Sequence, residues 1–238
     1  MSKRFTVVLV GAAMAAIVLA TTGAAWAQDA SYCKGGVVLD PGHGGTDTGA
    51  VYNKNGIYLK EKTEVLEVAY LLKSLLEDGY GPYYRVCMTR TSDSETLSNS
   101  ARYTYANTTG AKVLVSIHMN GSSDPNADYT TTLFGKWQKD KAFAYSIFGD
   151  NVNPPKINPP TYGLRTLLAA NGTGNHIATK TPYSYASGVL LKSNMPATIA
   201  ETVFITNTDE AKLLSDGTKE RERQIAAALE KGINNYPK

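Results

Sequence analysis

Short apolar runs alternate with helical stripes through the first half of the chain. Val37-Val38-Leu39 is followed by Asp40 and a turn rich in Pro and Gly, which predicts a buried strand ending there. The order strand, helix, strand, helix, strand then predicts a largely parallel sheet with helices on both faces. The expected elements are a strand at 37–40, a turn at Asn55-Gly56, a helix from a cap at Thr63 to Gly79, a strand at 84–89, a helix at 98–107 and a strand at 112–118.

The second half of the chain is less regular. The Pro-Pro pairs within 153–160 exclude a regular helix or a central strand there, and 163–187 shows no clear period. With no internal repeat, we expect a single α/β domain. The other expected elements are strands at 129–134 and 189–191, a segment at 197–202 leading into a strand at 203–205, and helices at 142–148, 207–214 (opened by a capping box of Asn207 and Glu210) and 225–233.

The first 27 residues predict a secretory signal peptide. Lys3 and Arg4 precede an apolar run, and Ala25-Trp26-Ala27 fits a cleavage site. The alternative is an uncleaved membrane anchor, but the run is short for a span of about 20 residues. We therefore expect a signal peptide at 1–27, a catalytic domain at 28–238 that is free of the membrane after cleavage, and a periplasmic or secreted protein.

Charge and cysteine content limit which partners the protein can bind and indicate its cellular compartment. The chain has 24 Lys and Arg against 21 Asp and Glu, and loss of Lys3 and Arg4 brings it close to balance, which argues against nucleic acid as a partner. Cys33 and Cys87 are the two cysteines. In an oxidising compartment they are expected to form a disulfide if their strands are neighbours, and two buried free thiols are the alternative.

Two of the three histidines fall where a ligand site belongs. His43 follows the first strand in Pro41-Gly42-His43-Gly44-Gly45, and His118 ends a later strand. The carboxyl ends of parallel strands are where ligands gather in such sheets, although His43 alone is equally compatible with a plain tight turn. Two imidazoles and a carboxylate would suit zinc and leave a fourth position for water. The position of the strands does not choose Glu61 over Glu64 or Glu67 as that carboxylate.

Glu201 is an acid inside an otherwise apolar segment. A buried carboxylate needs a partner or a purpose, because burying an unpaired charge is costly. Burial would raise its pKa and suit it to move a proton during hydrolysis. An ion pair with a Lys or Arg is the alternative.

Together these stretches resemble the zinc-dependent N-acetylmuramoyl-L-alanine amidases of the third amidase family, which includes cell-division amidases and lysins. The resemblance implies that His43, Glu61 and His118 bind one Zn²⁺, that Glu201 is the catalytic general acid and base, and that the substrate is peptidoglycan, cut between N-acetylmuramic acid and L-alanine of the stem peptide. It also implies a single α/β domain with a mixed, mostly parallel sheet of about six strands and helices on both faces. An activator protein is a second candidate partner. The matching stretches, in the family's order, are 39–47 with 49–50, 61–62, 89–93, Leu97, Arg102, 106–107, 115–120 and 195–207.

Other residues of these motifs have less specific expectations. Arg90 and Arg102 are expected to anchor loops, and Asp40 and Ser116 either to orient ligands or to satisfy loop backbone. Asn120 is a candidate substrate contact, and His176 is expected in a plain surface loop.

The segment 121–190 departs from part of the family. It contains no Glu, and we expect an open site without the acidic helix that covers the metal in some members. The competing functions are a zinc peptidase cutting within the wall peptide, a catalytically silent wall-binding module, and a structural zinc protein.

Overall fold

A computed structural model describes residues 30–80, 85–149, 163–165, 168, 178–179 and 183–236. The expected signal peptide, the Pro-rich stretch at 153–160 and His176 lie outside the described residues. Within them, no helix is both long and apolar enough to cross a membrane.

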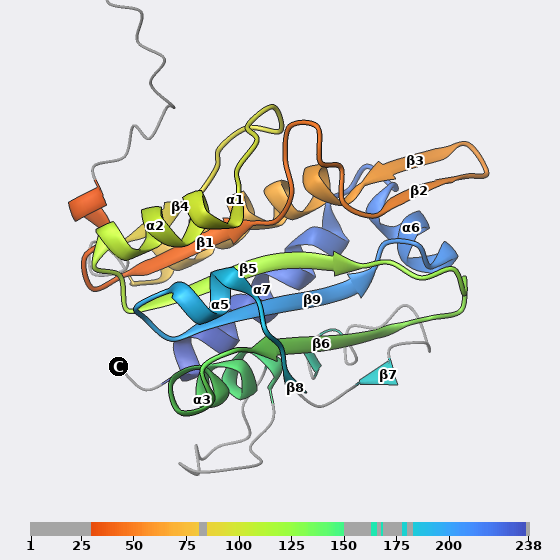
Figure 1. Ribbon diagram of the computed structural model, residues 1–238. Helices are drawn as coiled ribbons and strands as arrows, with labels where there is room; N and C mark the ends of the chain where they lie inside the picture. The colour runs from red at the N-terminus through yellow and green to blue at the C-terminus, as the bar shows by residue number, and fades with distance from the viewer. Residues whose placement is uncertain are drawn as a thin grey trace, which may run out of the picture.

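A seven-stranded mixed sheet forms the centre of the domain, in the order β4-β1-β5-β9-β6-β7, with β8 also paired to β6 (Figure 1). The pairs from β4 through β9 are parallel, and β6 runs antiparallel to β9. A separate antiparallel hairpin projects from one end of the domain. The strands are β1 (Val37–Pro41), β2 (Val51–Lys54), β3 (Ile57–Lys60), β4 (Val86–Met88), β5 (Val113–Asn120), β6 (Tyr129–Phe134), β7 (Ala178–Thr179), β8 (Tyr183–Ser184) and β9 (Ala197–Phe204).

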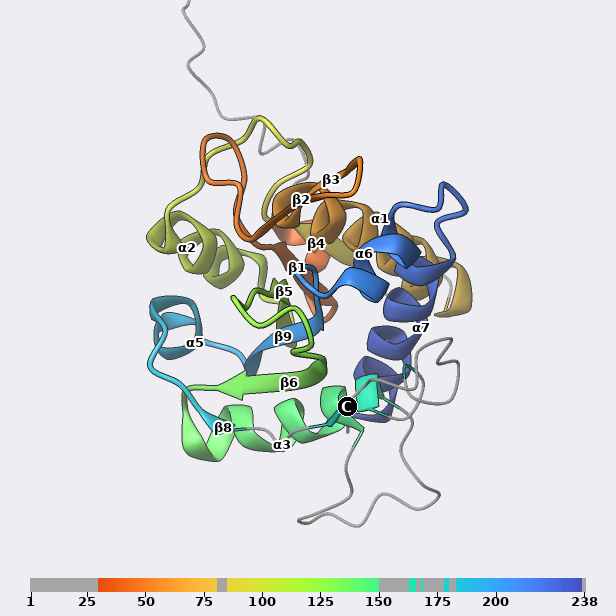
Figure 2. The same ribbon diagram turned by 90° about the vertical axis from the view of Figure 1, so that its right-hand side faces the viewer.

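Helices cover both faces of this sheet, which confirms the expected architecture (Figure 2). The helices α1, α3 and α7 pack on one face, and α2 and α5 lie on the other. A short α6 and an initial 3-10 turn complete the described elements. Their bounds are η1 (Ala30–Cys33), α1 (Glu61–Tyr80), α2 (Asn99–Thr109), α3 (Trp137–Phe148), α5 (Gly188–Lys192), α6 (Thr208–Leu214) and α7 (Glu220–Asn235).

The buried side chains of the sheet divide between two apolar clusters. Successive strand residues point to opposite faces, so Val115 joins the larger cluster under α1 and α7, while Leu114 joins the smaller cluster under α2 and α5. On the α2 and α5 side, the row begun by Leu114 continues to Ser116 and His118. Apolar packing therefore gives way to polar chemistry along one face of one strand.

Several sequence expectations are confirmed. Cys33 and Cys87 form a disulfide with a Cα–Cα distance of 5.9 Å, because β4 pairs with β1. Asn55 and Gly56 both have positive φ, 55° and 78°, which is the backbone of a tight hairpin turn between β2 and β3. Ser98 caps α2 by accepting a hydrogen bond from the backbone N–H of Ala101.

Two sequence expectations about local structure are wrong, and a third is confirmed only in part. Residues 189–191 are helical within α5, because a three-residue apolar run does not distinguish a strand from a short helix. The first helix begins at Glu61, and Thr63 donates to Asp93 instead of capping it. Asn207 does cap α6, but Glu210 bonds Arg221 of α7.

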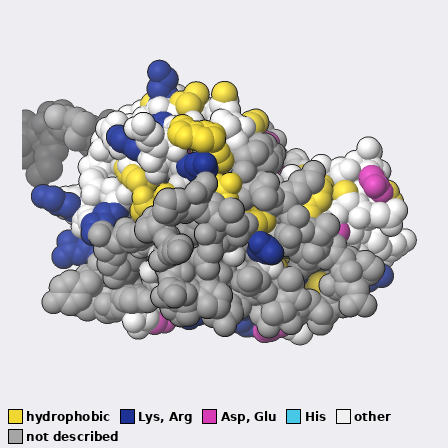
Figure 3. Space-filling model, turned by 90° about the horizontal axis from the view of Figure 1, so that it is seen from below, with side chains coloured by type: hydrophobic (Ala, Val, Ile, Leu, Met, Phe, Trp, Pro, Cys, Tyr) yellow, Lys and Arg dark blue, Asp and Glu magenta, His cyan; other side chains and the backbone are white. Residues whose placement is uncertain are grey.

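The outer surface near α3 combines apolar and basic side chains. Trp137 is 61% exposed, and the Lys141 ammonium lies 4.3 Å from the centre of its ring. Described apolar, Lys and Arg side chains are also interspersed on the underside of the molecule (Figure 3). This surface does not contribute to the site described next.

Candidate metal centre and active site

The loop after β1 places His43 in an unusual backbone conformation. His43 has φ 59°, which is uncommon for a residue other than Gly. Gly42 precedes it, and a Cβ atom at Gly42 would lie 2.3 Å from the His118 ring. Only glycine at position 42 lets the loop approach His118 this closely.

Two buried arginines hold this loop through its carbonyl groups, as the sequence suggested. Arg102 donates to the backbone oxygens of Pro41 (2.8 Å) and His43 (2.6 Å), and Arg90 donates to those of Pro41 (3.0 Å) and Gly42 (2.8 Å). Three consecutive carbonyls are thus bound by guanidinium groups, which stabilises the conformation that presents the His43 ring.

Asp40 acts on this loop through Arg102. Its carboxylate accepts hydrogen bonds from Arg102 (2.7 Å), Thr89 (2.6 Å) and Ser116 (2.7 Å). Burial would raise the pKa of Asp40, but the Arg102 charge and these hydrogen bonds lower it below its usual value. Asp40 is therefore an ionised anchor for Arg102, and Ser116 supports Asp40.

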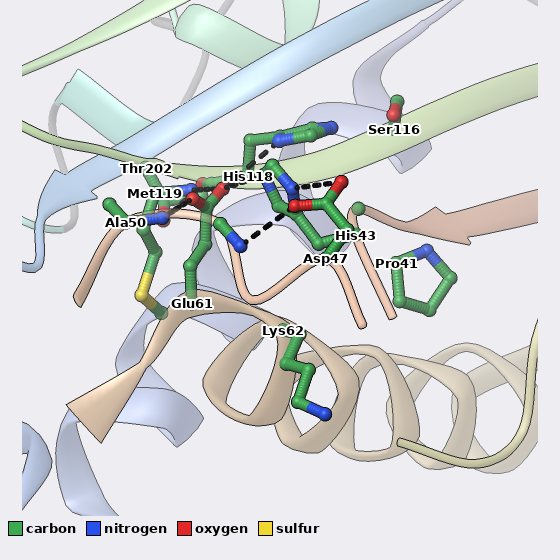
Figure 4. A network of polar contacts seen from close by, with 12 residues as sticks. Pro41, His43, Asp47, Ala50, Glu61, Lys62, Ser116, His118, Met119 and Thr202 are labelled. Carbon is green, nitrogen blue, oxygen red and sulfur yellow. Dashed lines mark hydrogen bonds and ion pairs between the residues drawn. The ribbon is translucent and has the colours of Figure 1, made fainter. Parts of the chain in front are cut away.

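Glu61 projects from the first turn of α1 between the two histidines (Figure 4). Its Oε1 atom lies 3.0 Å from His43 Nε2 and 3.0 Å from His118 Nδ1. Backbone N–H groups of Ala50 and Met119 also donate to this carboxylate, at 2.8 and 3.0 Å. Burial would raise the pKa of Glu61, but its contacts with the histidines lower it to about 2.

Asp47 orients the first histidine, a role that the sequence analysis missed. Its Oδ2 atom lies 3.0 Å from His43 Nδ1, and its Oδ1 accepts from the Gly49 N–H at 3.1 Å. An ionised carboxylate only accepts hydrogen bonds, so Asp47 favours the tautomer with the proton on Nδ1 and leaves the Nε2 lone pair for a metal. The signal available in the sequence was an acid four residues after His43 beside a Gly-rich turn.

The donor set formed by His43, Glu61 and His118 fits a metal ion. Their ligand atoms lie within 4.8 Å of one another, and no other such group occurs in the described part of the chain. Neither alternative acid on α1 joins them: Glu64 is buried elsewhere, and Glu67 pairs with Lys219. Two nitrogens and one oxygen suit zinc and leave a coordination position open.

Glu201 lies beside this group on β9. It is the register partner of His118 on the neighbouring parallel strand, and both side chains line one cavity. Burial is the main cause that raises the pKa of Glu201. Among the described residues it forms no ion pair with a Lys or Arg, so nothing there supports the paired-carboxylate alternative.

Asn120 is two residues beyond His118 on β5, with a register shift between them. It is not among the described residues that line the cavity, and its contact with substrate stays a prediction. The expected absence of a covering acidic helix also stays a prediction, because much of 121–190 lies outside the described residues.

Comparison with known families decides the affiliation. Residues 37–235 match the family model described as N-acetylmuramoyl-L-alanine amidase. The chain belongs to the N-acetylmuramoyl-L-alanine amidase family. The resemblance found in the sequence is thereby confirmed: this is a member of a family of amide hydrolases that act on peptidoglycan.

Individual relatives agree with this assignment. The chain is 31% identical to the amidase AmiA of Escherichia coli K12, over 84% of this chain and 75% of AmiA. It is 29% identical to the probable amidase AmiB of Haemophilus influenzae, over 83% of this chain but only 51% of AmiB, so it spans about half the length of that relative.

Solved structures support the same fold. The catalytic domain of the amidase CwlV from Bacillus (Paenibacillus) polymyxa superposes with a TM-score of 0.69 at 26% identity, covering 85% of this chain and 97% of that domain. An amidase from Clostridium difficile 630 gives 0.67 at 26% identity, over 86% and 97% of the two chains.

Proposed function

We propose that this amidase hydrolyses the amide between the lactyl group of N-acetylmuramic acid and L-alanine of the peptidoglycan stem peptide. The observation that carries the proposal is the convergence of His43, Glu61 and His118 beside the half-buried Glu201. The three would hold a zinc ion. If zinc were held there, it would supply polarisation of a carbonyl oxygen and a bound water whose pKa is lowered toward about 7.

The protein groups supply orientation and proton transfer. Glu201 accepts a proton from the water as the water oxygen bonds to the lactyl carbonyl carbon. When the carbon–nitrogen bond breaks, Glu201 returns that proton to the alanine nitrogen, so the products are a free lactyl carboxyl group and a free peptide amine. The raised pKa of Glu201 suits both transfers, because a carboxyl group titrating closer to neutrality both accepts and releases a proton readily.

The supporting shell keeps the ligands in place. Asp47 holds the His43 ring, and two backbone N–H groups hold Glu61. Such partners typically change metal affinity or activity by about 10- to 100-fold when removed. A structural zinc site would normally be closed by a fourth protein ligand, whereas this group opens onto a cavity of about 320 Å³.

Action on the cell wall would require the protein to lie in the periplasm or outside the cell, and the Cys33–Cys87 disulfide supports this part of the proposal. The signal peptide at 1–27 stays a prediction. The need for an activator protein stays a prediction.

The test is mass spectrometry of the products released from purified peptidoglycan. We expect intact stem peptides with a free N-terminal alanine, formed only when the metal is present and lost after chelation. Glu201→Gln should lower the rate by about 10²- to 10⁴-fold, because only proton transfer is removed, while the zinc content stays near one ion per chain.

Three results would contradict the proposal. Peptides shortened within the stem would make the protein a peptidase. Zinc binding and wall binding without product would favour a silent binding module. Undiminished release by Glu201→Gln would remove Glu201 from the mechanism.

A further inference from the structure

A crevice leads from the candidate active site into the face of the sheet covered by α2 and α5. His43, His118 and Glu201 lie at one end of it. Ser116 and Ile199, one pleat back on β5 and β9, form part of its floor. Figure 2 shows α2 and α5 on this same side of the sheet, so the crevice is the space that they leave between them.

The two walls come from segments distant in sequence. One wall is the start of α2, including Leu97 and Asn99, and the other is the segment from Tyr185 to Val189 at the start of α5. A Cβ atom on Gly188 would lie 3.8 Å from the Cβ of Asn99, which is van der Waals contact. At that point the walls are too close for a wide group to pass.

Hydrogen bonds connect the walls at the far ends of the helices. The Asn107 side chain on α2 donates to the Lys192 carbonyl at 3.0 Å and accepts from the Asn194 N–H at 2.7 Å. Neither helix can move apart there without breaking these bonds. The crevice therefore opens at the active site and is closed behind.

The shape discriminates between the two halves of a peptidoglycan substrate. A glycan strand continues on both sides of each muramic acid and cannot enter a crevice that is closed at one end. A stem peptide has one free end and begins with a small residue, alanine. A volume of about 320 Å³ is at the lower end of the roughly 300–1,000 Å³ typical of small-ligand pockets, and it suits the first residues of a peptide.

The position of Glu201 indicates where in the crevice the stem peptide begins. In the proposed function Glu201 protonates the alanine nitrogen, so the leaving peptide starts beside it. Glu201 is on β9, the strand against which α5 packs, and Tyr185 and Val189 line the crevice on that side.

We propose that the stem peptide enters the crevice between α2 and α5, and that Tyr185 and Asn99 on its opposite walls determine which stems are accepted. The proposal rests on the proposed function. Tyr185 is well placed for this role: its side chain is 48% exposed, while its backbone N–H is bonded to the Phe134 carbonyl at 2.8 Å. A fixed backbone carries a ring that remains free to contact a ligand.

The first experiment compares kcat/KM for muramoyl substrates with one, two and three stem residues. For the wild type we expect a rise of about tenfold or more from one residue to three, because remote contacts in the crevice contribute to catalysis. Tyr185→Ala and Gly188→Leu should reduce this ratio toward one. Tyr70→Ala and Leu191→Ala, which alter exposed side chains outside the crevice, serve as matched controls and should keep the wild-type ratio.

A binding measurement separates this proposal from the proposed function. Calorimetry with zinc-loaded Glu201→Gln protein and the released stem tripeptide should show binding that is weakened about tenfold or more by adding Gly188→Leu, since the leucine would fill the narrow point. If tripeptide binding is present and is weakened by Gly188→Leu, but the wild type cleaves no muramoyl amide, the crevice proposal is supported and the amidase function is refuted.

The crevice proposal itself is overturned if wild-type kcat/KM does not depend on stem length. It is equally overturned if Gly188→Leu leaves both the ratio and the tripeptide affinity unchanged. Dependence on glycan length that disappears in Gly188→Leu would show that sugar, not peptide, occupies the crevice.

Discussion

Replacing Arg102 by methionine tests whether the active-site loop depends on its guanidinium clamp. Arg102 is 4% exposed and makes three hydrogen bonds, to the Asp40 carboxylate, the Pro41 carbonyl and the His43 carbonyl. Methionine retains much of the apolar volume but none of the donors. Arg90 remains in the variant and still binds the Pro41 and Gly42 carbonyls. The groups most affected are therefore the His43 carbonyl and Asp40, which lose the hydrogen bonds that Arg102 donates.

The expected cost follows from what is left behind. Asp40 is 1% exposed and would keep its bonds from Thr89 and Ser116 but lose its only ion-pair partner among the described residues. Breaking a buried ion pair by removing one member typically costs about 3–5 kcal/mol. Since a domain is stable by about 5–15 kcal/mol, the variant should fold but be markedly less stable.

A second effect should appear at the metal. His43 has φ 59°, a conformation that costs a non-glycine residue about 1–3 kcal/mol and persists only where its surroundings enforce it. With its carbonyl released, the ring should sample positions unsuited to binding, and zinc affinity should fall by about 10- to 100-fold.

The assay is urea unfolding of the chelated protein together with zinc titration against a competing chelator. Arg223→Met is the matched control, because Arg223 is an exposed arginine that pairs with Glu220 at 3.8 Å and donates to the Thr218 carbonyl at 2.6 Å. Its replacement should change stability by less than about 1 kcal/mol. The double variant Arg102→Met with Asp40→Asn should recover part of the loss, since it leaves no buried charge unpaired. Zinc affinity equal to that of the wild type, with stability within about 1 kcal/mol, would refute the reasoning.

Two further predictions concern stability away from the active site. Burial and the nearby Glu222 raise the pKa of Glu64 from 4.5 to about 7. The stability that Glu64 contributes below pH 4.5 is therefore lost as pH rises through 7, and the free energy of unfolding should fall by up to about 3 kcal/mol over that window. Urea unfolding at a series of pH values should show that Glu64→Gln reduces this pH dependence, and an unchanged dependence would contradict this origin. The Cys33–Cys87 disulfide links residues 54 positions apart, and its reduction should lower the free energy of unfolding by about 4 kcal/mol in the chain-entropy model. Urea unfolding with and without reductant measures this loss, and equal unfolding midpoints would count against it.

The sequence by itself determined the alternation of strands and helices, because apolar periods of two and 3.6 residues are local properties. It also placed His43 and His118 at the ends of parallel strands, and it carried enough motifs to indicate the amidase family. The same local reading failed for residues 189–191, where three apolar residues are too few to show a period.

Residue spacing alone did not decide which acid joins the histidines; the family resemblance indicated Glu61, and the tertiary structure gives the physical reason. Glu61, Glu64 and Glu67 lie on one helix, and their spacing does not say which faces the sheet edge. The choice follows from β3 leading directly into α1 and from the Ala50 and Met119 N–H groups that receive the Glu61 side chain.

The same holds for the role of Asp47 and for the crevice between α2 and α5. Asp47 reaches His43 only because the loop takes a left-handed turn, and the crevice walls are about 90 residues apart in the chain. Such contacts depend on strand order and on how closely two helices pack, and a local pattern carries no information about either.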